Sequence, residues 1–486
     1  MKPVFPMRSS METVELEDLC EYAVKVGVKL GASYVEVRGQ LDEGRTLTSR
    51  NGVIEAYTSS LSSGIGLRVL VNGSVGLASL NELSKEAVKD RVKEAVKMAK
   101  ASIKLAEKVK LSEEETVRAK WAITERKDFD DVPLEEKVKL LTDLDRRLTS
   151  LSVNVAARIL ELSELRAVKY YANSEGSSIN GYAPRIMAWA TLVVKEVGDS
   201  EQAFIQRGGS GGWEVFEGLK FEDECVKTAI VLGRLLREAK LVPSGEIDIV
   251  LGGDVTGIAV HESTGHPYEA DRILGREVAQ AGGSFVKPDM LGRTIGSECV
   301  TVIDDPTLNG GYGSYAYDDE GVKARPKLLM KNGRINEFLH NRFTAAVFNV
   351  KSNGSARVSD YAKEPLVRMS NTYIAPGDYG LEELIEGVKL GVYVLSFTEW
   401  NIDDVRYNMR IVGGESYLIE NGKITGMVRR PIVEITTPAF YSSIDAVGKE
   451  LVFQAASCGK GDPQQPVPVW TGGPAIRLRK VRVAKP

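Results

Sequence analysis

The residues best suited to chemistry lie in one short segment. The 486-residue chain has three histidines, and two of them, His261 and His266, stand five positions apart with Glu262 directly after the first. Imidazole nitrogens are ligands that suit zinc, and a carboxylate beside the ion can take a proton from water. This segment therefore predicts a metal-dependent hydrolytic site with two histidine ligands and Glu262 as general base, for which peptide-bond hydrolysis is the natural reaction.

The spacing of the two histidines requires a distorted helix. Asp254 is a good N-cap, so we expect a short helix from about Val255 to Thr264. Residues five apart on a regular helix diverge by about 140°, which is too far for their side chains to share one ion. Gly265 can leave the right-handed region at little cost, and the position before Pro267 disfavours the helical conformation. We therefore expect either unwinding at Gly265 or one wide π-type turn, and both bring the second imidazole back toward the first.

The histidine pair also has an explanation without a metal. Two histidines near a helix end can cap backbone carbonyls and interact with the helix dipole. Because the pattern is short and its spacing unusual, it leaves metal binding and capping about equally open. A catalytic zinc site also needs a third protein ligand, with the fourth position kept for water. The two histidines alone do not identify that ligand.

The elements around this segment follow from hydrophobic periodicity and turn residues. Helical spacing predicts helices at 14–30, 84–108, 133–151, 223–241 and 381–390. Asn-Gly pairs between strand-like arms predict hairpins within 46–60 and 65–79, and again at 332–333 and 421–422. The glycine-rich segment 208–213 is interpreted as a flexible link.

Together these elements predict an α+β fold in three parts. Residues 1–127 form an N-terminal α+β domain with antiparallel hairpins and helices, and residues 128–243 form a central α+β region. Residues 244–486 form a β-rich metalloprotease domain, curled or barrel-like, that carries the metal-binding helix. A chain of this length exceeds the size at which a single core stops growing.

Composition excludes several classes of protein. The hydrophobic fraction of 43% and charged fraction of 27% are those of a soluble globular protein, and no apolar run approaches the roughly 20 residues that cross a bilayer. The net charge of −4 gives no reason to expect nucleic acid or a membrane as partner. Four scattered cysteines do not form a disulfide framework, and the first residues lack a signal-peptide pattern. We therefore expect a cytoplasmic protein.

Longer stretches of the chain carry a family resemblance. HESTGHPYEAD (261–271) resembles the HExxxH segment of the TldD/PmbA family of zinc metalloproteases. Further segments are similar to that family, namely YAYDDEGVKARPKLLMKNGRINEFL (315–339), RMSNTYIAPGD (368–378), SYLIENGKI (416–424) and SCGKGDPQQPVPVWTGGPAIRLRKVRV (457–483). The set is specific, and the hairpin at 65–79 extends the likeness weakly toward the amino terminus.

The resemblance implies the third ligand and the substrate. In TldD-type members a cysteine of the terminal CGK segment completes the zinc site, and that position is Cys458 here. A thiolate beside Zn²⁺ is deprotonated and a strong ligand, although a free cysteine more often packs as a small hydrophobe. The implied activity is hydrolysis of short or unfolded peptides, as in leader-peptide removal or peptide degradation, with the substrate paired to a strand edge.

The resemblance also implies a partner. The family forms dimers, so we expect a homodimer or a heterodimer with a TldE/PmbA-like paralogue that lacks the histidines, and this chain falls on the TldD side. The alternative is a non-catalytic peptide-binding or regulatory subunit of a TldD/TldE-like complex. Two features depart from the family: Pro267 stands where glycine is usual, and Asp462-Pro463 is an apparent insertion that could shift the strand after Cys458.

The remaining candidate residues are expected to be structural. Asp318-Asp319-Glu320 could attract a peptide amino terminus, but a solvated turn is the favoured interpretation. His340 matches no histidine of the family and is expected to be an ordinary partly buried or surface residue. The other cysteines, which lie in apolar patterns, are Cys20, Cys225 and Cys299.

Overall fold

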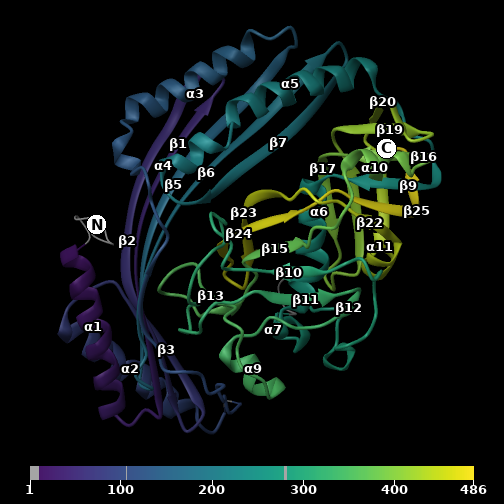
Figure 1. Cartoon of the computed structure of the whole chain (residues 1–486). Coiled ribbons are helices and arrows are strands. Elements are labelled where there is room, and N and C mark those ends of the chain that lie inside the picture. The colour runs from purple at the N-terminus through teal and green to yellow at the C-terminus, as the bar shows by residue number, and fades with distance from the viewer. Residues whose placement is uncertain (1–9, 106, 278–281) are drawn as a thin grey trace.

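A long, curved sheet built by the first two hundred residues frames the molecule (Figure 1). The computed structural model describes residues 10–105, 107–277 and 282–486. The sheet has the strand order β3-β2-β1-β5-β6-β4, with β7 beside β6. Its elements are α1 (Ser10–Lys29), β1 (Tyr34–Arg50), β2 (Val53–Val71), β3 (Ser74–Leu80), α2 (Lys85–Ser102), β4 (Arg118–Ala122), η1 (Phe129–Asp131), α3 (Leu134–Thr149), β5 (Val155–Asn173), β6 (Ser178–Glu196), β7 (Asp199–Ser210), α4 (Trp213–Gly218) and α5 (Phe221–Glu238).

The two predicted N-terminal hairpins are confirmed. Asn51 and Gly52 join β1 to β2, and Asn72 and Gly73 join β2 to β3, all four with positive φ as a tight hairpin turn requires. The fifth predicted helix, at 381–390, is present as the shorter Leu381–Glu386 of the C-terminal part, and the first four are present as α1, α2, α3 and α5. The first two pack on one end of the sheet, while the others share a second core at its opposite end (Figure 1).

The prediction of a flexible link at 208–213 is wrong. Residues 208–210 finish strand β7, and Trp213 begins α4 with a buried side chain. The glycines serve close packing instead, since a Cβ at Gly209 would stand 2.7 Å from the carbonyl oxygen of Gly310. The segment is therefore part of the interface between the long sheet and the C-terminal part.

The C-terminal part contains two larger open sheets. One has the order β12-β11-β10-β15-β24-β23, and the other β17-β18-β21-β25-β9-β16-β19-β20-β8 with β22 beside β25. The elements are β8 (Lys240–Leu241), β9 (Gly245–Leu251), α6 (Gly253–Val260), η2 (His261–Gly265), η3 (His266–Tyr268), α7 (Ala270–Ile273), η4 (Pro288–Met290), β10 (Val302–Asp304), β11 (Lys327–Lys331), β12 (Arg334–Ile335), α9 (Arg342–Phe348), β13 (Ala356–Arg357), β14 (Leu366–Val367), β15 (Asn371–Ile374), α10 (Leu381–Glu386), β16 (Leu390–Val394), β17 (Phe397–Ile402), β18 (Asn408–Gly413), β19 (Ser416–Glu420), β20 (Lys423–Arg429), β21 (Ile432–Thr436), α11 (Thr437–Ser443), β22 (Ile444–Val447), β23 (Val452–Lys460), β24 (Gln465–Gly473) and β25 (Ile476–Ala484).

The architecture confirms the predicted α+β class. Strands dominate the C-terminal part, and the Asn-Gly turns at 332–333 and 421–422 connect β11 to β12 and β19 to β20. The sheets are open, and none that the described residues form closes into a barrel. No helix in the described ranges is long and apolar enough to span a bilayer.

The helix α6 packs tightly against the sheet that contains β24. A Cβ at Gly257 would lie 2.7 Å from the backbone nitrogen of Gly472, and one at Gly253 would lie 2.6 Å from the carbonyl oxygen of Gly473. Only glycine therefore permits this approach of helix to strand. The close packing fixes where the C-terminal end of α6 lies, and that end carries the two histidines.

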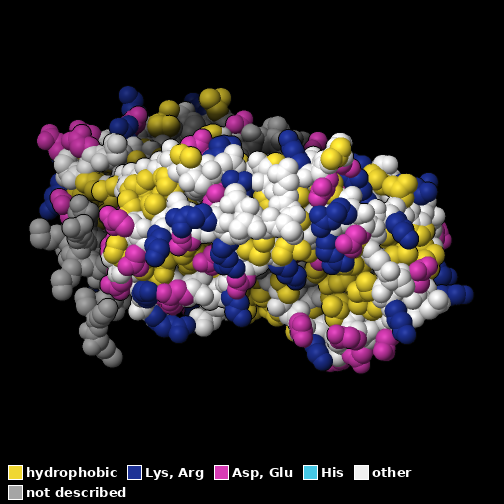
Figure 2. Space-filling view, turned by 90° about the horizontal axis from the view of Figure 1, so that it is seen from above, with side chains coloured by type: hydrophobic (Ala, Val, Ile, Leu, Met, Phe, Trp, Pro, Cys, Tyr) yellow, Lys and Arg dark blue, Asp and Glu magenta, His cyan; other side chains and the backbone are white. Residues whose placement is uncertain are grey.

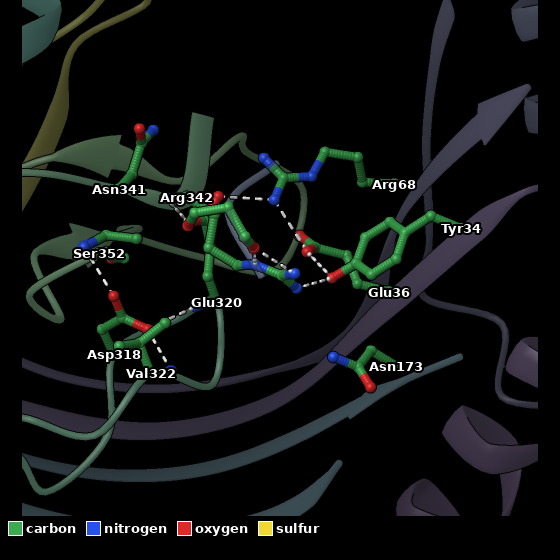
Figure 3. A network of polar contacts seen from close by, with 12 residues as sticks. Tyr34, Glu36, Arg68, Asn173, Asp318, Glu320, Val322, Asn341, Arg342 and Ser352 are labelled. Atoms are coloured by element: carbon green, nitrogen blue, oxygen red, sulfur yellow. Dashed lines mark hydrogen bonds and ion pairs between the residues drawn. The ribbon is translucent and has the colours of Figure 1, made fainter. Parts of the chain in front are cut away.

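Asp318 and Glu320 are buried and Asp319 is largely so, and the prediction of a solvated turn is therefore wrong. Figure 3 shows Glu320 among residues of the long sheet, where it accepts hydrogen bonds from Arg68 Nη2 at 2.6 Å and from the backbone nitrogen of Arg342 at 2.6 Å. Arg68 also binds Glu36 at 2.8 Å. The segment joins the N-terminal sheet to the C-terminal part through paired buried charges.

The residues expected to be structural fall into two groups. Cys20, Cys225 and His340 are buried, while Cys299 is exposed. The molecular surface agrees with the small net charge, since Figure 2 shows Lys and Arg side chains interspersed with Asp and Glu on the face seen from above. That face carries no extended patch of one sign of charge.

Candidate metal centre

The helix that carries the histidines begins earlier than predicted. Its N-cap is Gly252, and α6 starts at Gly253, so the prediction of Asp254 as N-cap is wrong. The carboxylate of Asp254 instead accepts hydrogen bonds from Arg207 of β7, at 2.7 Å and 3.3 Å. The side chain that could have capped the helix therefore ties its first turn to the long sheet.

The second half of the segment takes the wide turn that the spacing requires. A π-turn spans His261–Gly265, and a 3-10 turn follows at His266–Tyr268. Of the two predicted routes, unwinding at Gly265 is wrong, because Gly265 (φ −54°, ψ −65°) and His266 (φ −61°, ψ −47°) both stay in the right-handed region despite Pro267. The extra residue in the π-turn rotates the second histidine back toward the first.

Packing explains both the glycine and the stability of the π-turn. A Cβ at Gly265 would stand 1.7 Å from the Sδ atom of Met369, so a larger residue would clash. Ser263 donates a hydrogen bond to the carbonyl of Ala259 at 2.6 Å, and Thr264 donates one to the Tyr441 hydroxyl at 2.6 Å. These contacts hold the turn from two sides.

The structure brings the three predicted ligands together. Cys458 Sγ lies 3.3 Å from His261 Nε2 and 3.3 Å from His266 Nε2, and the three ligand atoms all lie within 4.8 Å of one another. The two imidazole rings stand edge to face with their centroids 4.9 Å apart. All three side chains are buried. Although the turn between β23 and β24 includes Asp462-Pro463, it leaves Cys458 paired with Val467 and beside the histidines.

This donor set fits a zinc ion. Imidazole nitrogen and thiolate sulfur are both zinc ligands, and a catalytic zinc site has three protein ligands with one position left open. Bonds of about 2.0–2.1 Å to nitrogen and 2.3 Å to sulfur around a tetrahedral ion place those atoms about 3.6 Å apart. The separation of 3.3 Å between Cys458 Sγ and each Nε2 is close to that value. Small side-chain shifts would therefore be enough to hold one ion.

A buried carboxylate that the sequence analysis did not identify orients the second histidine. Glu269 Oε2 lies 3.1 Å from His266 Nδ1, which turns Nε2 toward Cys458. The same oxygen pairs with Arg272 Nε at 2.8 Å and with Lys460 Nζ at 3.0 Å. Such carboxylate–histidine contacts fix the ring and its tautomer in metal sites. Glu269 stands three residues after His266, and this spacing could have identified it from the sequence as a partner of that histidine.

The strand that carries the thiol is anchored by buried cations. Arg368 donates hydrogen bonds to the carbonyl oxygens of Cys458 and, at 2.7 Å, of Gln465, thereby clamping β23 to β24. Lys460 Nζ also pairs with Asp271 at 2.7 Å. Burial raises the pKa of the Cys458 thiol, but the adjacent His266 and Arg368 outweigh it, and the pKa falls to about 7.

The predicted base lies beside an arginine. Glu262 Oε2 accepts a hydrogen bond from Arg406 Nη1 at 2.9 Å, and both side chains are largely buried. Arg406 is in a tight loop between β17 and β18 and has a positive φ of 65°. Burial raises the pKa of Glu262, but His266, His261 and Arg406 lower it below its ordinary value. The carboxylate is thus held in its ionised form next to the ligand cluster.

Comparisons with known proteins cover nearly the whole chain. Models of the PmbA/TldA metallopeptidase domain 1, central domain and C-terminal domain match residues 35–99, 127–239 and 244–485. A metalloprotease of Methanocaldococcus jannaschii is 32% identical over 448 residues, which is 91% of this chain and 95% of that protein. A protein of Saccharolobus solfataricus named zinc metalloprotease TldD homolog is 26% identical and covers 95% of this chain and 98% of its own length.

Solved structures share the fold at low identity. TldE from Thermococcus kodakarensis superposes with a TM-score of 0.76 at 18% identity, over 96% of this chain and all of that one. A Thermotoga maritima protein described as a candidate modulator of DNA gyrase has a TM-score of 0.77 at 19% identity, with the same coverage. At this identity the likeness establishes the fold alone.

Proposed function

We propose that this chain, which belongs to the PmbA/TldA family and is a metallopeptidase, hydrolyses short or unfolded peptides with zinc as its metal. His261, His266 and Cys458 would hold the ion, and Glu262 would act as general base. The observation that carries the proposal is the convergence of three buried ligand atoms within 4.8 Å of one another. The name of the Saccharolobus solfataricus relative supports zinc as the metal.

The residues around the ligands would have separate roles in the reaction. When bound, zinc would polarise the scissile carbonyl group and lower the pKa of water from about 15.7 toward 7. Arg406 holds Oε2 of Glu262, so we expect the other oxygen, Oε1, to take a proton from water and pass it to the leaving nitrogen. Glu269 would keep His266 oriented for binding the ion.

The free edge of β23 supports an extended substrate. β23 is the last strand of its sheet, and no strand of the described residues pairs with its outer edge. A peptide can add to such an edge through main-chain hydrogen bonds, a mode that reads extension more than side-chain identity. Because Cys458 lies on β23, a peptide bound there would pass the ligand cluster. Short or unfolded peptides meet this requirement better than folded proteins.

The proposal includes a partner subunit. The fold shared with TldE from Thermococcus kodakarensis supports a TldD/TldE-type relationship. We therefore expect the chain to work as a dimer, with a second copy or with a paralogue that lacks the histidines. The test below uses the chain alone and the chain co-expressed with such a paralogue.

The test compares wild type with Glu262→Gln in zinc content and peptide hydrolysis, each as the chain alone and as the chain co-expressed with the paralogue. We expect Glu262→Gln to keep one equivalent of zinc and to lose at least about 100-fold in kcat, because the ligands remain while the proton acceptor is gone. Glu434→Gln, on an exposed side chain, is the control and should behave as wild type. Wild-type activity in Glu262→Gln, or a wild-type complex without zinc, would contradict the proposal and favour a non-catalytic subunit.

A further inference from the structure

A cavity lies at the opposite end of the helical segment that carries the histidines. It has a volume of about 260 Å³ and lies between α5 and β7 on one side and the start of α6, β17 and β23 on the other. Its apolar lining includes Phe204, Phe397 and Val452, and two of these are unusually exposed for their type, Phe204 at 55% and Val452 at 42%. Exposed apolar side chains that gather at a cavity mark a binding site.

Four of the six charged residues that line this cavity are held in ion pairs. Arg207 binds Glu224 at 2.6 Å and Asp254 at 2.7 Å. Glu201 is bound by Arg429 at 2.8 Å and by Arg430 at 3.0 Å. Lys227 and Glu415 also line the cavity, but they carry opposite charges, so the net charge left by the ion pairs is small. The cavity therefore suits an uncharged, apolar group.

The cavity and the metal ligands share one face of β23. Side chains alternate along a strand, so Val452, Gln454 and Cys458 point to the same side. Helix α6 and the π-turn η2 that follows it cover this face, since Gly253 lies against Val452 and His261 against Cys458. Gln454, which lines the cavity, is four residues from Cys458, which corresponds to about 13 Å along the strand.

We propose that this cavity is a subsite for the peptide substrate, filled by an apolar or aromatic side chain about four residues from the scissile bond. The proposal rests on the function proposed above. A peptide paired with the free edge of β23 has the same spacing as that strand, so a residue four positions from the cleaved bond lies level with Gln454. The cavity volume is sufficient for one large side chain.

This subsite names a substrate class. Peptides that reach at least four residues beyond the scissile bond on the cavity side, with a large apolar residue there, should bind better than shorter ones or those with serine at that position. Burial of such a side chain corresponds to about tenfold or more in affinity. The chain would therefore act on peptides of moderate length and poorly on dipeptides and tripeptides.

The experiment measures binding of labelled peptides to the metal-free chain, which separates the cavity from catalysis. Two peptide series carry Phe or Ser at the fourth residue, one on the amino side and one on the carboxyl side of the intended bond. We expect one series to show about tenfold tighter binding of the Phe peptide. Thr228→Trp, which fills the cavity from α5, should abolish that preference. Ile230→Trp, exposed on the same helix and outside the cavity, should preserve it.

The outcomes separate this inference from the proposed function. Equal affinity for Phe and Ser peptides in both series, or a preference that survives in a folded Thr228→Trp protein, would overturn the subsite. If Thr228→Trp lowers the melting temperature well below that of Ile230→Trp, Phe204→Ser decides, and an undiminished preference in it overturns the proposal. Absence of zinc and of hydrolysis in the wild-type complex would instead refute the proposed function.

Discussion

Glu269→Gln tests whether the buried carboxylate behind His266 determines metal affinity. Glutamine keeps the shape of the side chain and one acceptor oxygen but removes the negative charge that faces His266, Arg272 and Lys460. Loss of such an outer contact typically lowers metal affinity about 10- to 100-fold. That range corresponds to about 1.4–2.8 kcal/mol of binding free energy. We expect the zinc dissociation constant of the variant to rise by this factor.

The same substitution should also lower the stability of the metal-free protein by a bounded amount. Removing one partner of a buried ion pair costs about 3–5 kcal/mol when the remaining charge is left uncompensated. Here Lys460 keeps Asp271 at 2.7 Å and the carbonyl of Val367 at 2.8 Å. The loss should therefore be closer to that of a single hydrogen bond to a charged group, about 1.5–3 kcal/mol.

Two measurements separate affinity from stability. Zinc affinity is obtained by titrating the metal-free protein against a chromophoric chelator at fixed pH, and stability by urea unfolding of the same metal-free protein. Glu164→Gln is the matched control. Glu164 is buried and its carboxylate lies 2.6 Å from Lys137 Nζ, and this ion pair is not part of the metal centre. The control variant should lose stability but bind zinc as wild type. Unchanged zinc affinity in Glu269→Gln, or an equal loss in Glu164→Gln, would refute the reasoning.

Two further predictions follow from packing and burial. Gly265→Ala should destabilise the protein by about 1–3 kcal/mol in thermal unfolding, because its Cβ would lie 1.7 Å from Met369 Sδ, whereas Gly426→Ala, with open space around it, should have little effect. Burial lowers the pKa of His340 to about 4, so the unfolded chain binds a proton at this residue more readily than the folded protein does. The folded protein should therefore lose up to about 3 kcal/mol of stability as the pH falls from about 6.5 to 4. Urea unfolding over this pH range should show a smaller loss for His340→Gln than for wild type.

The sequence predicts that the helix carrying the histidines is distorted, but it does not predict which packing contacts cause the distortion. The interval from His261 to His266 excludes a regular helix, and a π-turn was one of the two predicted solutions. The choice between them depends on tertiary packing. Met369 fills the space beside Gly265, and Tyr441 binds Thr264, and both come from segments more than a hundred residues away. Single-sequence periodicity contains no information about such neighbours.

The supporting charges show the same limit. Glu269 lies close enough in sequence to His266 to be found by spacing, whereas Lys460 and Arg368 reach the site only because β23 and the segment before β15 fold next to it. Their burial also runs against the usual exposure of Lys and Arg. A buried cation of this kind is intelligible only once its carboxylate or carbonyl partner is located in space.

Buried charge at two interfaces explains how the long sheet can contribute to a site that it does not carry. Arg207 of β7 binds Asp254 in the first turn of α6, and Arg68 of β2 binds Glu320 of the C-terminal part. Breaking either pair would leave the carboxylate of Asp254 or of Glu320 without its arginine, and the cost of doing so opposes separation of the two parts. The wall formed by β7 and α5 is therefore held at a fixed distance from α6 and β23. If the proposed function holds, a substrate that reaches His261 along β23 would enter a space whose width is set by these pairs, and an extended chain would fit that space better than a folded domain.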